Sequence, residues 1–137
     1  MTFRFFILVL FLFLIGGCAS TQSKFNLNEA IQVAGELASP NKDQFFMFHI
    51  PEGSPIKGTS SKLSKHLVEA AKAKANLAII GPDFELNFGI LKGSLLSHNA
   101  NSLKGANIVY LGYEKQFKEL AQLSNQTGAT LVTAMYP

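Results

Sequence analysis

The sequence predicts an α/β fold, a three-layer sandwich around a mainly parallel sheet of about four strands. Short apolar runs of strand length alternate along the chain with helical patterns of about 10–15 residues, and Gly or Pro separates several of them. Such alternation implies right-handed crossovers between parallel strands, with helices covering both faces of the sheet.

Predicted helices and strands follow one another through most of the chain. In order, we expect a helix from Asn26 or Asn28 to about Leu37, a strand over 44–50 covered on both faces, a loop over 51–60, a helix over about 61–75, a strand over 77–80, a polar loop over 98–105, a strand over 106–111, a helix over 114–127 with Gly128 as its C-cap, and a strand over 129–136.

Segment 83–97 fits two descriptions. Its apolar residues alternate from Phe84 to Ile90, as in a strand, yet they also recur at helical spacing. We favour a helix because Pro82 followed by Asp83 is a good start signal. The alternative is an added antiparallel hairpin and a mixed sheet.

An apolar run over residues 5–15 follows Arg4 near the amino terminus. It is too short to span a bilayer as a helix, which needs roughly 20 residues. The run closes with Leu14-Ile15-Gly16-Gly17-Cys18, which resembles the lipobox of bacterial lipoproteins. The resemblance implies cleavage before Cys18, whose sulfur then carries diacylglycerol and whose amino group is acylated, for example with palmitate.

The predicted organisation is a signal peptide over 1–17, a lipidated amino terminus and tether over 18–26, and one α/β domain over 27–137. Two or more acyl chains hold a protein stably on a membrane, so we expect the membrane to be one partner. Ala19 follows the Cys where retention at the inner membrane commonly needs Asp. By resemblance, and for a Gram-negative source, this favours the periplasmic face of the outer membrane.

The composition excludes several classes of site. The formal net charge is +3, a mild excess that does not indicate a nucleic-acid partner. Cys18 is the only cysteine, so neither a disulfide nor a cysteine-based metal site is expected. The fold must therefore rest on its core, for which the apolar patterns nominate Leu77, Ile79, Ile108, Val109, Leu111, Leu120 and Val132.

Weak site candidates lie at the predicted carboxyl ends of the strands, where open parallel sheets bind ligands. His49, Asp83 and Glu114 together could ligate a divalent metal or perform acid–base chemistry. The structural alternative is favoured: His49 is a satisfied residue, Asp83 a helix cap and Glu114 a favourable acid in a first helical turn. We expect no catalytic residue, no metal site and no cofactor.

Other motifs are incomplete. The segment 53–60 looks like a phosphate-binding loop, but Thr59 stands where the lysine of GxxxxGK[ST] belongs. Anion binding near Lys57 at a helix start is the residual possibility. No serine lies in GxSxG and no Ser-His-Asp order stands out. There is no HExxH and no paired-His ligand spacing, and we expect His66 and His98 to face solvent. The lysines between 57 and 74 are expected to form a solvated face.

Function is therefore expected from a surface. The anchor and the compact size favour a membrane-anchored cell-envelope lipoprotein that binds another protein, as an assembly module or helper of a secretion or surface machine. A periplasmic immunity or inhibitor lipoprotein is one alternative, and a small ligand- or metal-binding enzyme using the strand-end residues is another. The sequence does not separate the first two, because both need only a folded surface.

Overall fold

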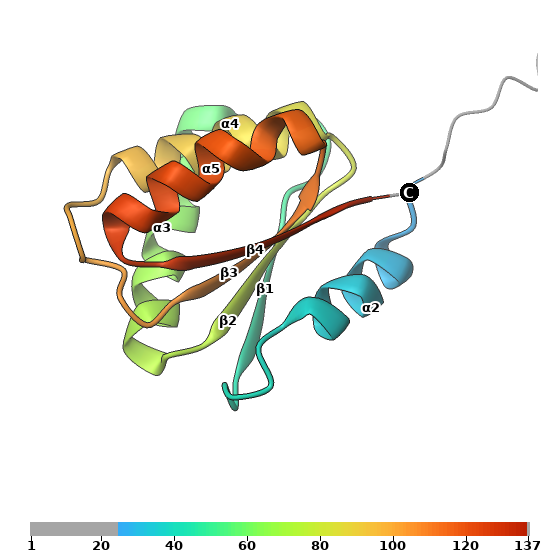
Figure 1. Cartoon of the computed structure of the whole chain (residues 1–137). Coiled ribbons are helices and arrows are strands. Elements are labelled where there is room, and N and C mark those ends of the chain that lie inside the picture. The colour runs from blue at the N-terminus through green and yellow to red at the C-terminus, as the bar shows by residue number, and fades with distance from the viewer. Residues whose placement is uncertain (1–24, 137) are drawn as a thin grey trace, which may run out of the picture.

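The structure is a computed structural model that describes residues 25–136, so the predicted signal peptide, Cys18 and most of the tether lie outside the described residues. Helices and strands alternate along the described chain (Figure 1). In order, they are α2 (Leu27–Leu37), β1 (Phe45–His49), α3 (Ile56–Ala73), β2 (Asn76–Ile80), α4 (Phe84–Leu96), β3 (Asn107–Gly112), α5 (Glu114–Thr127) and β4 (Thr130–Met135).

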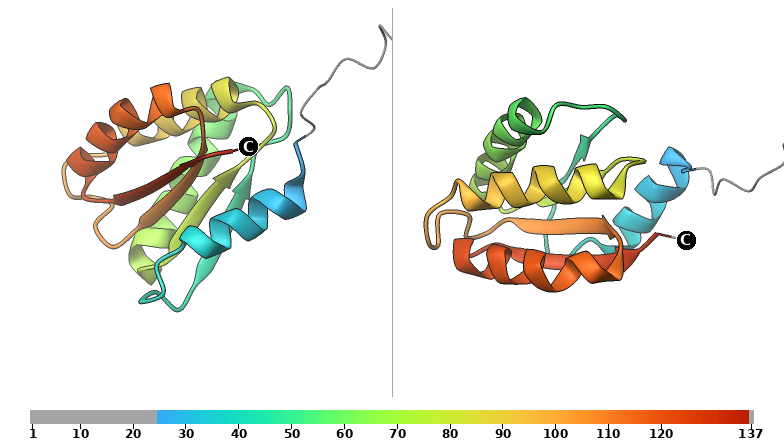
Figure 2. Two further views of the ribbon diagram at one scale, coloured as in Figure 1. Left: turned by 45° about the vertical axis from the view of Figure 1, so that its right-hand side comes forward. Right: turned by 90° about the horizontal axis from the view of Figure 1, so that it is seen from above.

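The strands form one sheet in the order β1-β2-β3-β4, and every pairing is parallel. Helices α3, α4 and α5 lie on one face of this sheet, and α2 lies alone on the other (Figures 1 and 2). The predicted three-layer α/β architecture is confirmed. Segment 83–97 forms the favoured helix, because Asp83 caps α4 and no hairpin interrupts the parallel pairing.

The core has two parts. The larger cluster fills the space between the sheet and α3, α4 and α5, and the smaller one lies beneath α2. Of the predicted core residues, only Val132 is not fully buried. The reason is its position, since β4 is at the edge of the sheet and α2 packs chiefly on β2 and β3.

Two predicted features of the first strand and the following helix are wrong. Strand β1 is not covered on both faces: Phe45 is 39% exposed and Met47 42%, because α2 packs chiefly on β2 and β3. Helix α3 begins at Ile56 rather than near 61. Pro55 immediately precedes it with φ −68°, which suits a helix start, and the Thr59 N–H already donates to the Pro55 carbonyl.

The end of the predicted tether belongs to the domain. Asn26 caps α2, since its side-chain oxygen accepts a hydrogen bond of 3.1 Å from the Glu29 N–H. The ring of Phe25 packs on Tyr136, with 5.3 Å between the ring centroids. The start of α2 is therefore held beside the end of β4.

A polar ladder crosses the amino ends of three strands on the α2 face. Asn107 donates to the Asn76 side-chain oxygen at 2.6 Å, and the Thr130 hydroxyl donates to the Asn107 side-chain oxygen at 2.7 Å. These residues are in register across β2, β3 and β4. Because buried amides are costly without partners, this ladder favours the observed register.

Candidate functional site

The carboxyl ends of the strands do not form the crevice that many parallel sheets use for ligands. Such crevices arise where the strand order reverses. Here the order runs from β1 to β4 without reversal, and all three crossover helices lie on the same face. This topology has no switch point.

The strand-end candidates occupy separate structural positions. His49 is exposed at the end of β1, and Glu114 is exposed in the first turn of α5. Asp83 accepts a hydrogen bond of 3.0 Å from the Leu86 N–H, as the cap of α4. No hydrogen bond or ion pair joins the three side chains, and within residues 25–136 no three His, Cys, Asp or Glu side chains cluster closely enough to hold a metal ion.

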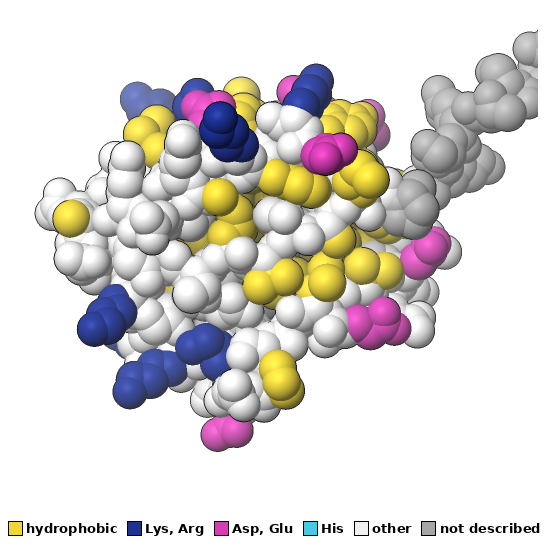
Figure 3. Space-filling view, in the orientation of Figure 1, with side chains coloured by type: hydrophobic (Ala, Val, Ile, Leu, Met, Phe, Trp, Pro, Cys, Tyr) yellow, Lys and Arg dark blue, Asp and Glu magenta, His cyan; other side chains and the backbone are white. Residues whose placement is uncertain are grey.

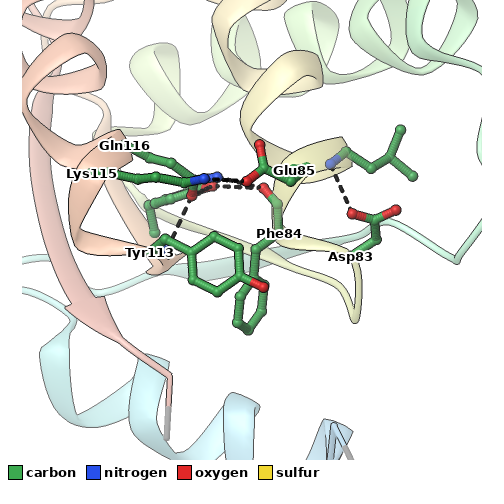
Figure 4. A network of polar contacts seen from close by, with 8 residues as sticks. Asp83, Phe84, Glu85, Tyr113, Lys115 and Gln116 are labelled. Atoms are coloured by element: carbon green, nitrogen blue, oxygen red, sulfur yellow. Dashed lines mark hydrogen bonds and ion pairs between the residues drawn. The ribbon is translucent and has the colours of Figure 1, made fainter.

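Gln116 forms the main polar connection at this end of the sheet. Its side-chain oxygen accepts from the Tyr110 hydroxyl at 2.7 Å and from the Tyr113 N–H at 3.1 Å. Its amide nitrogen donates to the Phe84 carbonyl at 3.0 Å. Figure 4 shows how these contacts join the starts of α4 and α5. A Cβ at Gly112 would lie 2.7 Å from the Gln116 oxygen, so glycine is needed there.

An ion pair lies beside this connection. Lys115 Nζ is 2.8 Å from Glu85 Oε1, and this hydrogen bond raises the pKa of Lys115 above its ordinary value. Burial, aided by the negative charge of Glu85, raises the pKa of Tyr110 above its ordinary value of 10, so the phenol stays protonated as a donor. Contacts among the chain's own residues therefore occupy the region between the ends of β2 and β3.

The residues of the incomplete phosphate-type motif lie mostly in a helix. Lys57 and Thr59 belong to the first turn of α3, so they do not form a loop around an anion. Lys57 lines one end of a groove of about 550 Å³ between α3 and α4, which has a serine-rich lining. The lining residues are Ile56, Lys57, Ser60, Ser61, Ser64, Gly93 and Ser97.

The prediction for His98, which contacts Ser64 of this groove, is wrong in part. His98 does not simply face solvent: its Nε2 lies 2.8 Å from the Ser64 hydroxyl, and the side chain is partly buried. Burial lowers the pKa of His98 below its ordinary value of 6.5, although a hydrogen bond with the Ser64 backbone opposes this. In the described chain no carboxylate forms an ion pair with His98. The contact between His98 and Ser64 joins the end of α4 to α3.

No local motif reveals the Ser64–His98 pair, because 34 residues separate its members. The pair depends on the close packing of α3 on α4. A Cβ at Gly93 would lie 3.0 Å from Ser60 Oγ, and Ser94 donates to the Ser60 carbonyl at 2.7 Å. Gly93 of α4 therefore stands where the two helices approach most closely.

Apolar side chains are exposed at both edges of the sheet. Phe45 and Met47 are exposed on β1, and Met135 is 62% exposed at the end of β4. Figure 3 views the molecule onto β4 and shows hydrophobic side chains on both sides of that strand. Helix α2 also carries partly exposed hydrophobic side chains. These edges are the apolar surfaces that the helices leave uncovered.

Within residues 25–136, no helix combines the length and the apolar character needed to cross a bilayer. In comparisons with known proteins, no family model, no curated protein and no solved structure matches this chain.

Proposed function

We propose that this chain is a lipid-anchored protein of the bacterial cell envelope whose domain binds a protein partner. The anchor is supported by the sequence from Leu14 to Cys18, which resembles a lipobox. Placement at the periplasmic face of the outer membrane, in a Gram-negative source, is part of the proposal. The observation that carries partner binding is the open face of β1, where two large apolar side chains remain in contact with solvent.

The chemistry around β1 indicates the kind of partner. Phe45 and Met47 alternate along the strand and therefore project from the same face of the sheet. Exposed apolar clusters are typical of interaction surfaces. The partner would offer an apolar surface that covers Phe45 and Met47.

The anchor is tested by Cys18→Ala in the full chain. Because the thiol is the group that is lipidated, the variant should lose all labelling by an alkyne analogue of palmitate and should accumulate as uncleaved precursor. Metabolic labelling followed by membrane fractionation measures both effects. Unchanged labelling in the variant would exclude Cys18 as the acylated residue.

The partner surface is tested by photocrosslinking from a photoreactive amino acid placed at Met47. The expected result is a discrete adduct that disappears when Phe45 is changed to Asp, because the contact would then bury a charge in apolar surroundings. A photoreactive residue at the exposed Gln122 of α5 is the matched control. Equal capture from both positions, or capture indifferent to Phe45→Asp, contradicts a specific site at β1.

A further inference from the structure

Strand β4 is a sheet edge without the features that normally prevent pairing with another strand. In the part of the chain that the structure describes, it pairs only with β3, and the register is continuous from Thr130 to Met135. The strand contains neither a charged residue nor proline, and its continuous register leaves no bulge. Lysine, proline and bulges are the common devices that protect an edge.

The main-chain groups that β4 directs outward can be identified. The Thr130 N–H donates to the Ala106 carbonyl at 3.0 Å, so Thr130 points its backbone groups toward β3. Because this direction alternates along a strand, Val132 and Ala134 do the same, and the intervening residues point their groups away. Leu131, Thr133 and Met135 therefore present main-chain donors and acceptors to a further strand.

We propose that β4 pairs antiparallel with β4 of a second copy of this chain, giving a two-fold symmetric dimer with one continuous sheet. One register uses every outward group of the strand. It places Thr133 opposite Thr133 of the second copy and Leu131 opposite Met135. Val132 then lies opposite Ala134 on the α2 face, so apolar or hydroxyl side chains meet at each position and Met135 becomes covered.

Charge at the two ends of β4 supports a second copy as the occupant. Lys104 lies beside the start of the strand, since a Cβ at Gly128 would be 3.4 Å from its Cβ. Glu29 lies near the other end, because the Asn26 N–H donates to the Tyr136 hydroxyl at 2.9 Å and Asn26 caps the helix that contains Glu29. Glu114 follows β3 at that same end.

None of Lys104, Glu29 and Glu114 belongs to an ion pair within residues 25–136. Below the strand in Figure 3, basic side chains gather toward the start of β4 and acidic ones toward its end. Antiparallel pairing brings the basic end of one copy to the acidic end of the other, and symmetry repeats this contact.

The geometry also suits two anchored chains. A two-fold axis perpendicular to the sheet keeps α2 on the same face of both copies, so Phe25 lies on that face in each copy. The seven residue steps from Cys18 to Phe25 span at most about 25 Å. Two anchors in one membrane are therefore compatible with this dimer. Only this compatibility with two lipid anchors rests on the proposed function.

The register is tested by cysteine crosslinking of the full chain extracted in detergent. Thr133→Cys should form a disulfide-linked dimer on mild oxidation, because Cα atoms of a hydrogen-bonded antiparallel pair lie about 5.5 Å apart, within disulfide range. Thr130→Cys, on the same strand but not opposite itself, should not crosslink. Crosslinking through Met47→Cys but not Thr133→Cys would place the contact at β1 and overturn the proposal.

A second measurement does not depend on cysteine. Thr133→Pro removes an outward N–H without removing a hydrogen bond to β3, and should weaken the dimer at least about tenfold in sedimentation equilibrium. Thr133→Val keeps the N–H and should behave like the parent. Lys104→Glu should weaken the dimer, and adding Glu29→Lys and Glu114→Lys should restore it. This charge exchange tests the dimer even if the proline variant does not fold.

The outcomes separate this inference from the proposed function. A parent chain that stays monomeric at every concentration, while Cys18 is acylated, overturns only the dimer. A Thr133→Cys crosslink in a chain that is not acylated overturns only the anchor. The parent chain, with Cys18 as its sole cysteine, reports any crosslink made through Cys18 itself.

Discussion

At the scale of single residues, Gln116 and His98 join segments that are far apart in the sequence. Gln116 of α5 is joined to the start of α4 through the Phe84 carbonyl and to β3 through the Tyr110 hydroxyl. His98 connects the end of α4 to α3 through the Ser64 hydroxyl. Both residues act on packing between helices, and neither belongs to a recognised catalytic motif.

His98 should make the stability of the domain depend on pH. Burial holds its pKa below the value of 6.5 that it regains in the unfolded chain. Below about pH 6.5 the unfolded chain therefore binds more protons at His98 than the folded one, and the free energy of unfolding falls as pH decreases toward the folded pKa. Urea unfolding at several pH values measures this effect.

The variant His98→Gln is the control, since glutamine does not titrate. Its free energy of unfolding should fall less steeply between about pH 6.5 and pH 5 than that of the parent. An identical slope in the two proteins would show that His98 does not contribute to the dependence.

At the scale of elements, helix ends explain most of the agreement between sequence and structure. Asn26 and Asp83 cap α2 and α4 as predicted, and Gly128 ends α5 with φ 86°, a conformation that favours glycine. The start of α3 was predicted too late, because Gly58 and the nearby prolines resemble a loop. Its residues still complete the first turn after Pro55.

The cap of α4 can be tested directly. Asp83→Ala should lower the free energy of unfolding by about 1 kcal/mol, because the Leu86 N–H loses its acceptor. Asp83→Ser keeps an acceptor and should recover most of this loss in urea denaturation. If alanine and serine are equally destabilising, the carboxylate contributes something other than capping.

At the scale of the whole molecule, one face of the sheet carries three helices and the other carries one. The larger core lies on the three-helix face and includes Ile108 and Leu120, both fully buried. The face beneath α2 is covered mainly over β2 and β3, which leaves the two edge strands partly exposed. The larger part of the core therefore lies on the first face, and the proposed contacts with other proteins use the edges.

The assignment of the core predicts large losses of stability on truncation. Ile108→Ala and Leu120→Ala should each lower the free energy of unfolding by about 2–5 kcal/mol, because each leaves a cavity in close-packed surroundings. Leu96→Ala, at a position that is 61% exposed, is the matched control and should change stability by less than about 0.5 kcal/mol. Similar small losses at all three positions would contradict this core.

The sequence by itself determined the order of helices and strands, the parallel α/β class and most of the buried residues. These features depend on periodicity and on capping residues such as Asp83 and Gly128, which act within a few positions along the chain. Only the tertiary structure decided that β1 and β4 are edges, that Phe45 and Met47 are exposed, and that Ser64 meets His98. Strand order and helix packing bring together residues distant in the chain, and no local pattern encodes those distances.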